Sequence, residues 1–284
     1  MIALMTSLER NGWWLVVAGL LCLYLPTYWD LANGIWQTDE QFHGVIILLI
    51  VLWLLLRSES QIWQFKGRPS NGIGSASLAF GLILYILGRS QEILLFEVGS
   101  QIPVLAGVLL LMSGKESLYA AWFPLLYSVF MLPLPSSVVD SLTGPLKQGV
   151  SYFVEQFLYQ AGYPIARQGV VLMIGRYELL IADACSGLNS MFSLAALGLL
   201  FMYLISRRSL SYNLLMVASI IPIAFLANVV RVSALVLITF YLGDEAGQGF
   251  MHGFAGMVLF VTALGGFFLL DIVLGLISRS GDRI

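Results

Sequence analysis

The sequence is poor in charged residues. Asp, Glu, Lys and Arg make up only 11% of its 284 residues, whereas 59% are hydrophobic. A soluble domain is about 25% charged. A single soluble core of this length cannot enclose so many apolar side chains, so lipid must solvate much of the surface. We therefore predict an all-α polytopic membrane protein, with one domain over 1–284.

Cysteine and histidine are also scarce, and their scarcity excludes several classes of protein. The chain has two cysteines and two histidines, too few for a disulfide framework or a zinc site. It contains neither C-x-x-C nor H-E-x-x-H, and no G-x-S-x-G is paired with a matching His, which argues against zinc proteases and rhomboid-type serine proteases. No basic cluster indicates nucleic-acid binding. We expect no cofactor and no metal.

Long apolar stretches dominate what remains. A helix of about 17 to 25 apolar residues crosses the hydrocarbon core. The first stretch lacks a small-x-small cleavage site, which favours a retained helix. The fifth ends at Pro133 and Pro135, which lack the backbone N–H of a helix. The seventh exceeds one crossing, so either Pro222 kinks it or its outer end protrudes. We predict eight spans, near 12–29, 43–57, 72–89, 93–112, 117–134, 186–205, 210–242 and 250–277.

The basic residues indicate an orientation. Nine of the fourteen Lys and Arg flank these helices on one side, four lie on the other, and Arg231 lies within a span. Cytoplasmic loops are enriched in Lys and Arg, so both termini are predicted to be cytoplasmic. The segment 135–184 would then be external. Its first part has helical apolar spacing and could lie on the outer surface, and β-prone runs around Gly175 and Arg176 suggest a hairpin.

Three polar residues are predicted to lie at one depth near the outer face. Cys185 is at the outer end of the sixth helix, which runs inward. Arg231 is some 20 residues along the seventh, a rise of about 30 Å that equals the core thickness. His252 falls in the first turn of the eighth helix, which begins outside.

These residue types suit acyl transfer. Cys185 at a helix N-terminus near a cation would favour the thiolate, and His252 could exchange protons with it. Arg231 can only donate hydrogen bonds, which suits an oxyanion or a substrate carbonyl. Each residue also has an ordinary interpretation, as packing for Cys185, as a snorkelling side chain for Arg231 and as a polar cap for His252. Their coincidence at one level favours a site.

Neighbouring polar residues have two interpretations each. Asn228 lies three residues before Arg231 on nearly the same face, and Asn189 stands four after Cys185; both either support the site or mediate helix packing. Asp183 either pairs with Arg231 or His252, or is a loop carboxylate that favours the helix N-terminus. Ser186 is predicted to be a helix cap rather than a catalyst.

Five motifs together resemble the exosortase/archaeosortase family of membrane cysteine transpeptidases. They are "FHGVIILL", "FMLPLP", "ADACSGLNS", "LANVVRV" and "MHGFAG", in this order. The third looks most like the B-type exosortases. The resemblance implies that Cys185 is the nucleophile, Arg231 the essential cation and His252 the acid/base, although some archaeal relatives have Arg at the His252 position. His43 opens the second-helix motif and is a candidate supporting residue, but it follows Phe42 where many exosortases have Ser, which argues against a role for it.

The resemblance also implies the substrate and the location. The enzyme would reside in a bacterial inner membrane with its site facing the periplasm, in a context of exopolysaccharide production. It would cleave the C-terminal PEP-CTERM sorting signal of exported proteins and pass the new carboxyl end to an unspecified acceptor, such as a glycan or a lipid. Arg231, with the backbone N–H groups of Ser186 and Gly187, would stabilise the oxyanion.

Two other functions remain open from the sequence. A purely hydrolytic intramembrane protease would use identical residues. A transporter or polysaccharide-export component would need no catalytic cysteine, but transporters often have paired halves that meet at the midplane, and no internal repeat is evident here.

Overall fold

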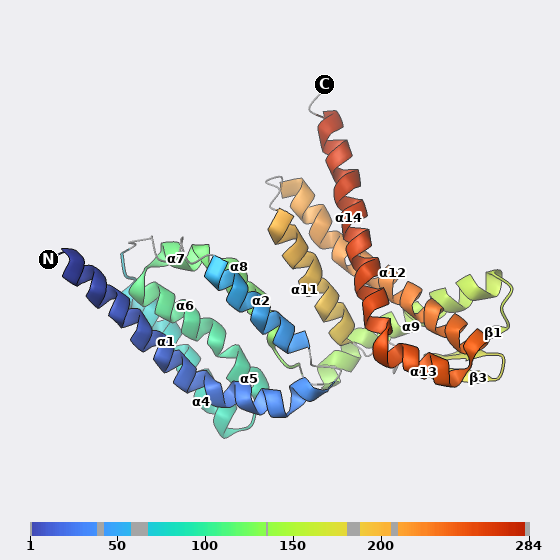
Figure 1. Cartoon of the computed structure of the whole chain (residues 1–284), viewed down its shortest axis with the longest axis horizontal. Helices are drawn as coiled ribbons and strands as arrows, with labels where there is room; N and C mark the ends of the chain where they lie inside the picture. Colours follow the sequence, from blue (N-terminus) through green and yellow to red (C-terminus); the bar gives the residue numbers. More distant parts are fainter. Residues whose placement is uncertain are drawn as a thin grey trace. The chain divides into compact units, whose positions relative to one another are not determined.

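The computed structural model describes six stretches of the chain, which are mostly helical. The described residues are 2–38, 43–57, 68–134, 136–180, 188–205 and 210–281. They form two compact units, Met1–Pro133 and Leu134–Ile284, and Figure 1 shows the helices and strands of each. The prediction of a mostly helical protein is confirmed, because helix occupies most of the described part of each of the eight expected spans.

The first unit is entirely helical in its described part. Its elements are α1 (Ile2–Asn33), η1 (Ile35–Gln37), α2 (His43–Arg57), α4 (Asn71–Ser90), α5 (Leu94–Gly99), α6 (Gln101–Met112), α7 (Lys115–Ala120), α8 (Trp122–Tyr127) and η2 (Ser128–Met131). The predicted fifth span is thus divided among α7, α8 and η2, and it ends two residues before Pro133.

Glycine allows α4 to approach α5 and α6 closely. Gly74, Gly81 and Gly88 recur every seven residues on α4, and all are buried. A Cβ at Gly81 would lie 2.6 Å from Val104 Cγ2, and one at Gly88 would overlap the backbone of Glu97. Small residues at a helix interface let backbones meet in this way inside membranes, where van der Waals packing drives association.

Hydrogen bonds between side chains attach α1 to α5 and α6. Thr27 Oγ1 donates to Glu97 Oε1 at 2.6 Å, and Tyr24 Oη and Ser100 Oγ are 2.9 Å apart. The buried Glu97 carboxylate also accepts from Arg89 Nη1 at 3.1 Å. These interactions offset the free-energy cost of burying the Glu97 carboxylate, since a buried charge is tolerated when it is paired and hydrogen-bonded.

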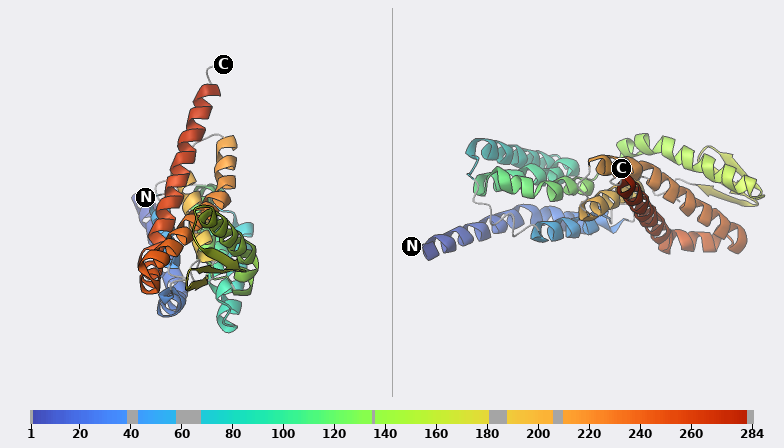
Figure 2. Two further views of the ribbon diagram at one scale, coloured as in Figure 1. Left: turned by 90° about the vertical axis from the view of Figure 1, so that its right-hand side faces the viewer. Right: turned by 90° about the horizontal axis from the view of Figure 1, so that it is seen from above.

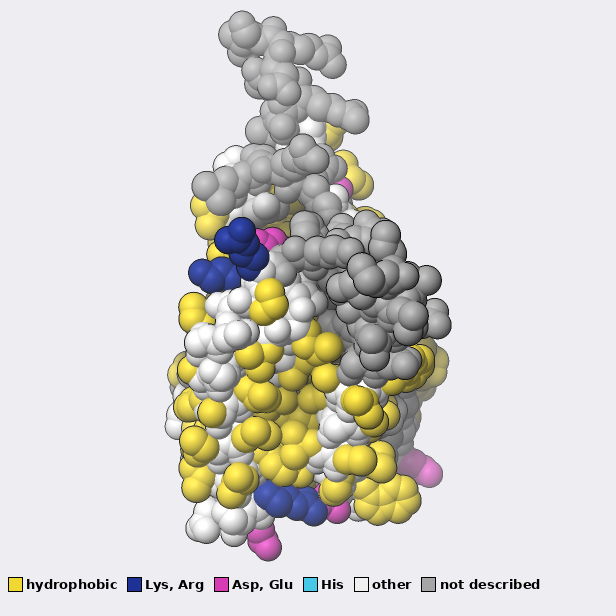
Figure 3. All heavy atoms as spheres, turned by 90° about the vertical axis from the view of Figure 1, so that its left-hand side faces the viewer, with side chains coloured by type: hydrophobic (Ala, Val, Ile, Leu, Met, Phe, Trp, Pro, Cys, Tyr) yellow, Lys and Arg dark blue, Asp and Glu magenta, His cyan; other side chains and the backbone are white. Residues whose placement is uncertain are grey.

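Charged side chains mark the two ends of this unit. Arg89 forms an ion pair with Asp30 at one end of α4. Arg68 and Lys115 lie at the other end, where the carbonyl oxygen of Arg68 lies close to Gly114. The 20 residues of α4 separate these ends by about 30 Å, the thickness of the hydrocarbon core. Figure 3 shows hydrophobic side chains across the middle of one face, with charged side chains at its ends.

The second unit combines helices with a small sheet. Its elements are α9 (Ser136–Gln160), β1 (Ile165–Gln168), β2 (Val171–Ile174), β3 (Tyr177–Leu180), α11 (Leu188–Ile205), α12 (Leu210–Leu242), α13 (Asp244–Gly253) and α14 (Ala255–Gly281). The expected helix-plus-hairpin segment is present, with one strand more than predicted. The helix α12 continues through Pro222 for 33 residues, so Pro222 does not divide it.

The sheet is an antiparallel meander in the order β1-β2-β3. Ile174 pairs with Tyr177 across the predicted Gly175-Arg176 turn, and Gln168 pairs with Val171 across Gly169 and Val170. Glycine opens both turns with a positive φ, +66° at Gly169 and +58° at Gly175, a conformation that costs other residues more. The hairpin prediction is confirmed.

One face of the sheet packs on α9 and α12. Leu172 and Ile174 of β2 are fully buried in a cluster with Val154 of α9 and Val236 of α12. The remaining buried members of this cluster come from α9, α12, β1 and β3. The sheet therefore rests on the second half of α12, as the views in Figure 2 also show for α9 and the strands.

Five helical segments of the described chain are long and apolar enough to cross a membrane. They are Trp14–Asn33, Asn71–Ser90, Leu94–Met112, Ser211–Leu242 and Ala255–Leu276. The apolar helices His43–Arg57, Trp122–Met131 and Ser193–Ile205 are shorter. The remaining three of the eight expected spans therefore correspond to apolar helices below that length.

Candidate active site

The site is built around α12, which contacts α9, α11, α13, α14 and β3. One stripe of α12 recurs at three- and four-residue spacing and faces α11 and α14: Met216, Ile220, Ala224 and Ala227 are buried there with Leu194, Leu259 and Phe267. A second stripe faces α9 and the sheet. The two stripes explain why this helix is half buried although its composition is apolar all round.

Arg231 continues the first stripe by one turn beyond Ala227. The residues 220, 224, 227 and 231 follow the i, i+4, i+7, i+11 pattern of one helix face. Arg231 is 7% exposed, so its guanidinium is within the protein rather than in the headgroup region. The snorkelling interpretation of Arg231 does not fit this burial.

The helix α11 begins level with Arg231. A Cβ at Gly198 of α11 would lie 2.9 Å from Ile220 Cγ1, so these residues are level on the two helices. Leu188, where α11 begins, is ten residues from Gly198, and Arg231 is eleven from Ile220. At 1.5 Å per residue these rises are about 15 and 17 Å. The first turn of α11 and Arg231 therefore share one level.

The start of α14 lies close to the same level. A Cβ at Gly266 would lie 3.1 Å from Ile223 Cγ2, which pairs these residues across the two helices. Ala255, where α14 begins, is about 17 Å from Gly266, whereas Arg231 is about 12 Å from Ile223. Ala255 is buried. The two levels thus differ by about 5 Å.

The prediction that His252 lies in the first turn of the last membrane helix is wrong. His252 lies in the last turn of α13, and α14 begins at Ala255 after a break at Phe254. The chain turns back at Gly243, which has a φ of +91°, and Gly247 of α13 packs on Thr239 of α12. This short hairpin of helices returns the chain toward Arg231 before the last span starts.

The backbone of His252 is nevertheless near the level of Arg231. His252 is five residues beyond Gly247, a rise of about 8 Å, and Arg231 is eight residues before Thr239, a rise of about 12 Å. Because Gly247 and Thr239 are in contact, these levels differ by about 4 Å along the axis of α12. The structure describes only the backbone at His252.

Asn228 is brought together with Arg231. It lies one turn earlier on α12 and is 5% exposed. Its Nδ2 donates to the Ala224 carbonyl at 3.1 Å. Among the residues that the structure describes, its Oδ1 has no hydrogen-bond partner. A buried acceptor left in this state costs about 1–3 kcal/mol, so helix packing alone does not account for it.

The other expected site residues differ in how far the structure describes them. Asp183, Cys185, Ser186 and Gly187 lie outside the described residues. Asn189 is the second residue of α11, where only the backbone is described. His43 is half-buried and opens α2 in the first unit.

Sequence reasoning missed two contributors on α12 and α13. Thr239 is fully buried, and its Oγ1 has no partner among the described residues. It lies eleven residues, or three turns, after Asn228, so both are on one side of α12. Gly247 provides the space into which the Thr239 side chain packs. The signal available in the sequence was this eleven-residue spacing of polar residues in an apolar helix.

Within the described part of the chain, no group of three His, Cys, Asp or Glu side chains could hold a metal ion. Arg231 and Asn228 instead offer hydrogen-bond donors and an acceptor, the groups that recognise a peptide or an acyl carbonyl.

Comparison with protein families identifies the chain. The model of the transmembrane exosortase family (Exosortase_EpsH) matches residues 35–269. The chain belongs to the transmembrane exosortase family. The match covers both units of this exosortase and includes Arg231, His252 and the "ADACSGLNS" segment. No curated protein and no solved structure matches it significantly.

Family membership supports the coarse function. Exosortases are multi-pass membrane proteins and generally cysteine transpeptidases, and membership implies processing of PEP-CTERM substrate proteins. The resemblance stated from the five motifs is thereby confirmed at the level of the family.

Proposed function

We propose that this exosortase cleaves the C-terminal signal of PEP-CTERM proteins with Cys185 as nucleophile and transfers the new carboxyl end to an acceptor. The reaction takes place at the periplasmic face of a bacterial inner membrane. The observation that carries the proposal is the burial of Arg231 on the stripe of α12 that faces α11 and α14, level with the start of α11. Cys185 precedes that start by three residues.

The first half-reaction forms a thioester. The Cys185 thiolate attacks the carbonyl carbon of the scissile peptide, and the C–N bond breaks once the leaving amine takes a proton. His252 supplies that proton after receiving the one from the thiol. In the second half-reaction an acceptor amine or hydroxyl attacks the thioester, and the Cys185 thiol leaves. Neither half-reaction requires an oxidant or a cofactor.

Arg231 and Asn228 have complementary roles in this scheme. Arg231 donates to the oxygen that becomes negative in the tetrahedral intermediate. The Asn228 Oδ1 accepts from a substrate peptide N–H, which supplies the partner that it lacks among the described residues. A peptide segment offers both donors and acceptors along its backbone, so the two residues together bind the substrate backbone and place the scissile carbonyl for attack.

The proposed topology agrees with the substrate. The signal of a PEP-CTERM protein contains an apolar helix, so its scissile bond is delivered at the edge of the membrane. In the first unit, Arg68 and Lys115 lie at the end of α4 opposite Arg89, which supports a cytoplasmic assignment of that end. Arg231 lies near the other boundary if α12 starts in the cytoplasm.

The decisive experiment follows a PEP-CTERM substrate in membranes with Cys185→Ala. We expect processing to disappear, and we expect Cys185→Ser to be nearly inactive because a hydroxyl ionises far less readily than a thiol. The matched control is Cys22→Ala, because Cys22 is exposed on α1 in the first unit. Processing at the wild-type rate in Cys185→Ala would end the proposal.

A second measurement separates transfer from hydrolysis. Hydroxylamine should intercept the thioester and leave a hydroxamate on the substrate, and an amine acceptor should appear at the new carboxyl end by mass spectrometry. A free carboxylate as the sole product, with acceptor present, would identify a hydrolytic protease instead.

A further inference from the structure

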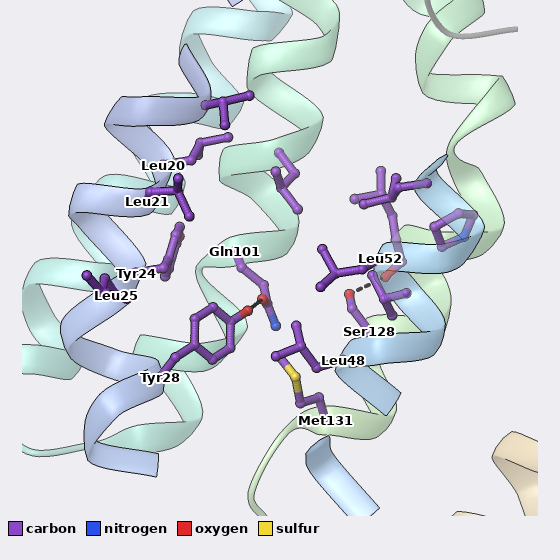
Figure 4. A pocket seen from close by; sticks show the side chains of 16 residues that line it. Leu20, Leu21, Tyr24, Leu25, Tyr28, Leu48, Leu52, Gln101, Ser128 and Met131 are labelled. Atoms are coloured by element: carbon purple, nitrogen blue, oxygen red, sulfur yellow. Dashed lines mark hydrogen bonds between the residues drawn. The ribbon is translucent and has the colours of Figure 1, made fainter. Parts of the chain in front are cut away.

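The first unit contains an apolar pocket that the proposed chemistry does not use. It has a volume of about 310 Å³ and lies between α1, α2, α6, α8 and η2. Leu20 and Leu21 of α1 face Leu48 and Leu52 of α2 across it, as Figure 4 shows. Leu21 and Leu52 are exposed, so the pocket opens sideways to the surrounding lipid.

One buried amide lines the pocket, beside the hydroxyl-bearing residues Tyr24, Tyr28 and Ser128. Gln101 is 5% exposed, and its Nε2 has no hydrogen-bond partner among the described residues. Tyr28 Oη donates to Gln101 Oε1 at 2.6 Å, which fixes the amide so that its nitrogen points into the pocket between Leu48 and Met131 (Figure 4). A buried donor without a partner is costly. The pocket therefore fits an apolar ligand that has one hydrogen-bond acceptor.

The depth of this amide in the membrane indicates which class of ligand the pocket can bind. Tyr28 lies two residues before Asp30, whose ion pair with Arg89 marks one end of the membrane-spanning helices. From Tyr28 to Val17, the far end of the lining on α1, the helix rises about 17 Å. One leaflet of the hydrocarbon core is about 15 Å thick. The pocket thus extends across one leaflet, with its amide at the polar boundary.

We propose that this pocket binds one acyl chain of a diacyl glycerolipid, whose ester carbonyl accepts a hydrogen bond from Gln101 Nε2. Ester groups lie at the boundary between headgroups and hydrocarbon, where Gln101 is placed, and the chain then follows α1 toward Val17.

The test uses the full-length protein in phosphatidylcholine vesicles that contain a diacyl phospholipid with a photoreactive diazirine in one acyl chain. We expect crosslinks to α1, α2 and α6 around the pocket. Leu48→Trp fills the pocket and should abolish these crosslinks. The control is Leu49→Trp on the neighbouring position of α2, which is exposed and does not line the pocket; it should leave them unchanged.

The role of the ester is tested with a dialkyl ether analogue that carries the same headgroup and diazirine. The ether cannot accept the hydrogen bond from the buried Gln101 Nε2 as the ester carbonyl does. Its crosslinking yield at the pocket should therefore be about five-fold lower than that of the ester. Gln101→Met should remove this preference for the ester, and Tyr28→Phe, which releases the amide from the orientation that the Tyr28–Gln101 hydrogen bond fixes, should weaken it.

Three results would overturn the assignment. One is equal labelling of Leu48→Trp and Leu49→Trp. Another is labelling of the wild type that maps away from α1, α2 and α6. The third is labelling of the pocket by a photoreactive PEP-CTERM helix that excludes the lipid. The outcome is independent of Cys185 chemistry, because lipid binding is measured without substrate turnover.

Discussion

Asn228 lies one helical turn before Arg231 on α12, and both residues are buried. The amide nitrogen of Asn228 is bonded to Ala224, while its oxygen has no partner among the described residues. Arg231 can only donate and Asn228 Oδ1 can only accept. The two residues therefore have different tasks toward one substrate, and their substitutions should have different effects.

Asn228→Leu should separate substrate binding from folding. Leucine has a similar size and removes a buried acceptor that has no partner in the described part, so the free energy of unfolding should change by less than about 1 kcal/mol. Processing should fall about ten-fold, because the hydrogen bond to the substrate is lost. Thermal unfolding in detergent and a processing assay measure the two effects. A large loss of stability with normal turnover of the folded fraction would assign Asn228 to packing.

The rate of processing should be at least about a hundred-fold lower in Arg231→Lys than in the wild type. Lysine retains the positive charge but replaces a planar fork of five N–H donors with a point charge. Removal of one donor to an oxyanion costs about 10²–10³ in rate. The control Arg167→Lys changes an arginine that pairs with Glu155 on the sheet surface, at 3.1 Å, and should remain active. Equal rates for Arg231→Lys and the wild type would contradict the role of the guanidinium.

Gly247→Ala should displace α13 from α12 and reduce processing. The new methyl would overlap Thr239 Oγ1, and overpacking of this kind costs about 1–3 kcal/mol. Thr239→Ala removes the oxygen, so the double variant should recover stability and activity together. Gly249→Ala is the matched control, because nothing lies within 4 Å of a Cβ at that position of α13. Additive losses in the double variant would show that this contact does not position α13.

Gly88→Ala should destabilise the first unit by about 1–3 kcal/mol. Its methyl would overlap the backbone of Glu97, which cannot move away as a flexible side chain could. Gly72→Ala on the same helix has open space around its Cβ, so it should be neutral or slightly stabilising. Unfolding temperatures of the two variants in one detergent give the comparison. Similar temperatures would mean that α4 and α5 do not approach as closely as described.

Much of the secondary structure was predictable from local pattern. Runs of apolar residues predicted the approximate positions of the eight expected spans, because the length and composition of a span are properties of consecutive residues. The turn at Gly175 was also local, because glycine readily adopts a positive φ. The strand Ile165–Gln168 was missed, because Ala, Arg and Gln favour strands weakly and this segment is extended only through its pairing with β2.

The break at Phe254 could not be read from hydropathy. Apart from His252, the run from Phe250 to Ala255 is apolar or glycine and could continue a span, yet the chain forms α13 and then restarts as α14. The fit of Gly247 on Thr239 explains this, and that contact joins residues of two helices. Likewise, the sequence does not show that Thr239 packs on Gly247 of α13.

The sequence by itself determined the membrane class, the approximate helices, the family motifs and the polar residues Arg231 and Asn228, because each depends on residue type and local spacing. Only the tertiary structure decided which face of α12 packs on α11 and α14, that α11 begins level with Arg231 and α14 close to that level, and that Gln101 points its amide into an apolar pocket. These features arise from contacts between helices that are far apart in the chain, where side-chain shape and the need to satisfy buried polar groups select one packing among many with the same hydrophobic pattern.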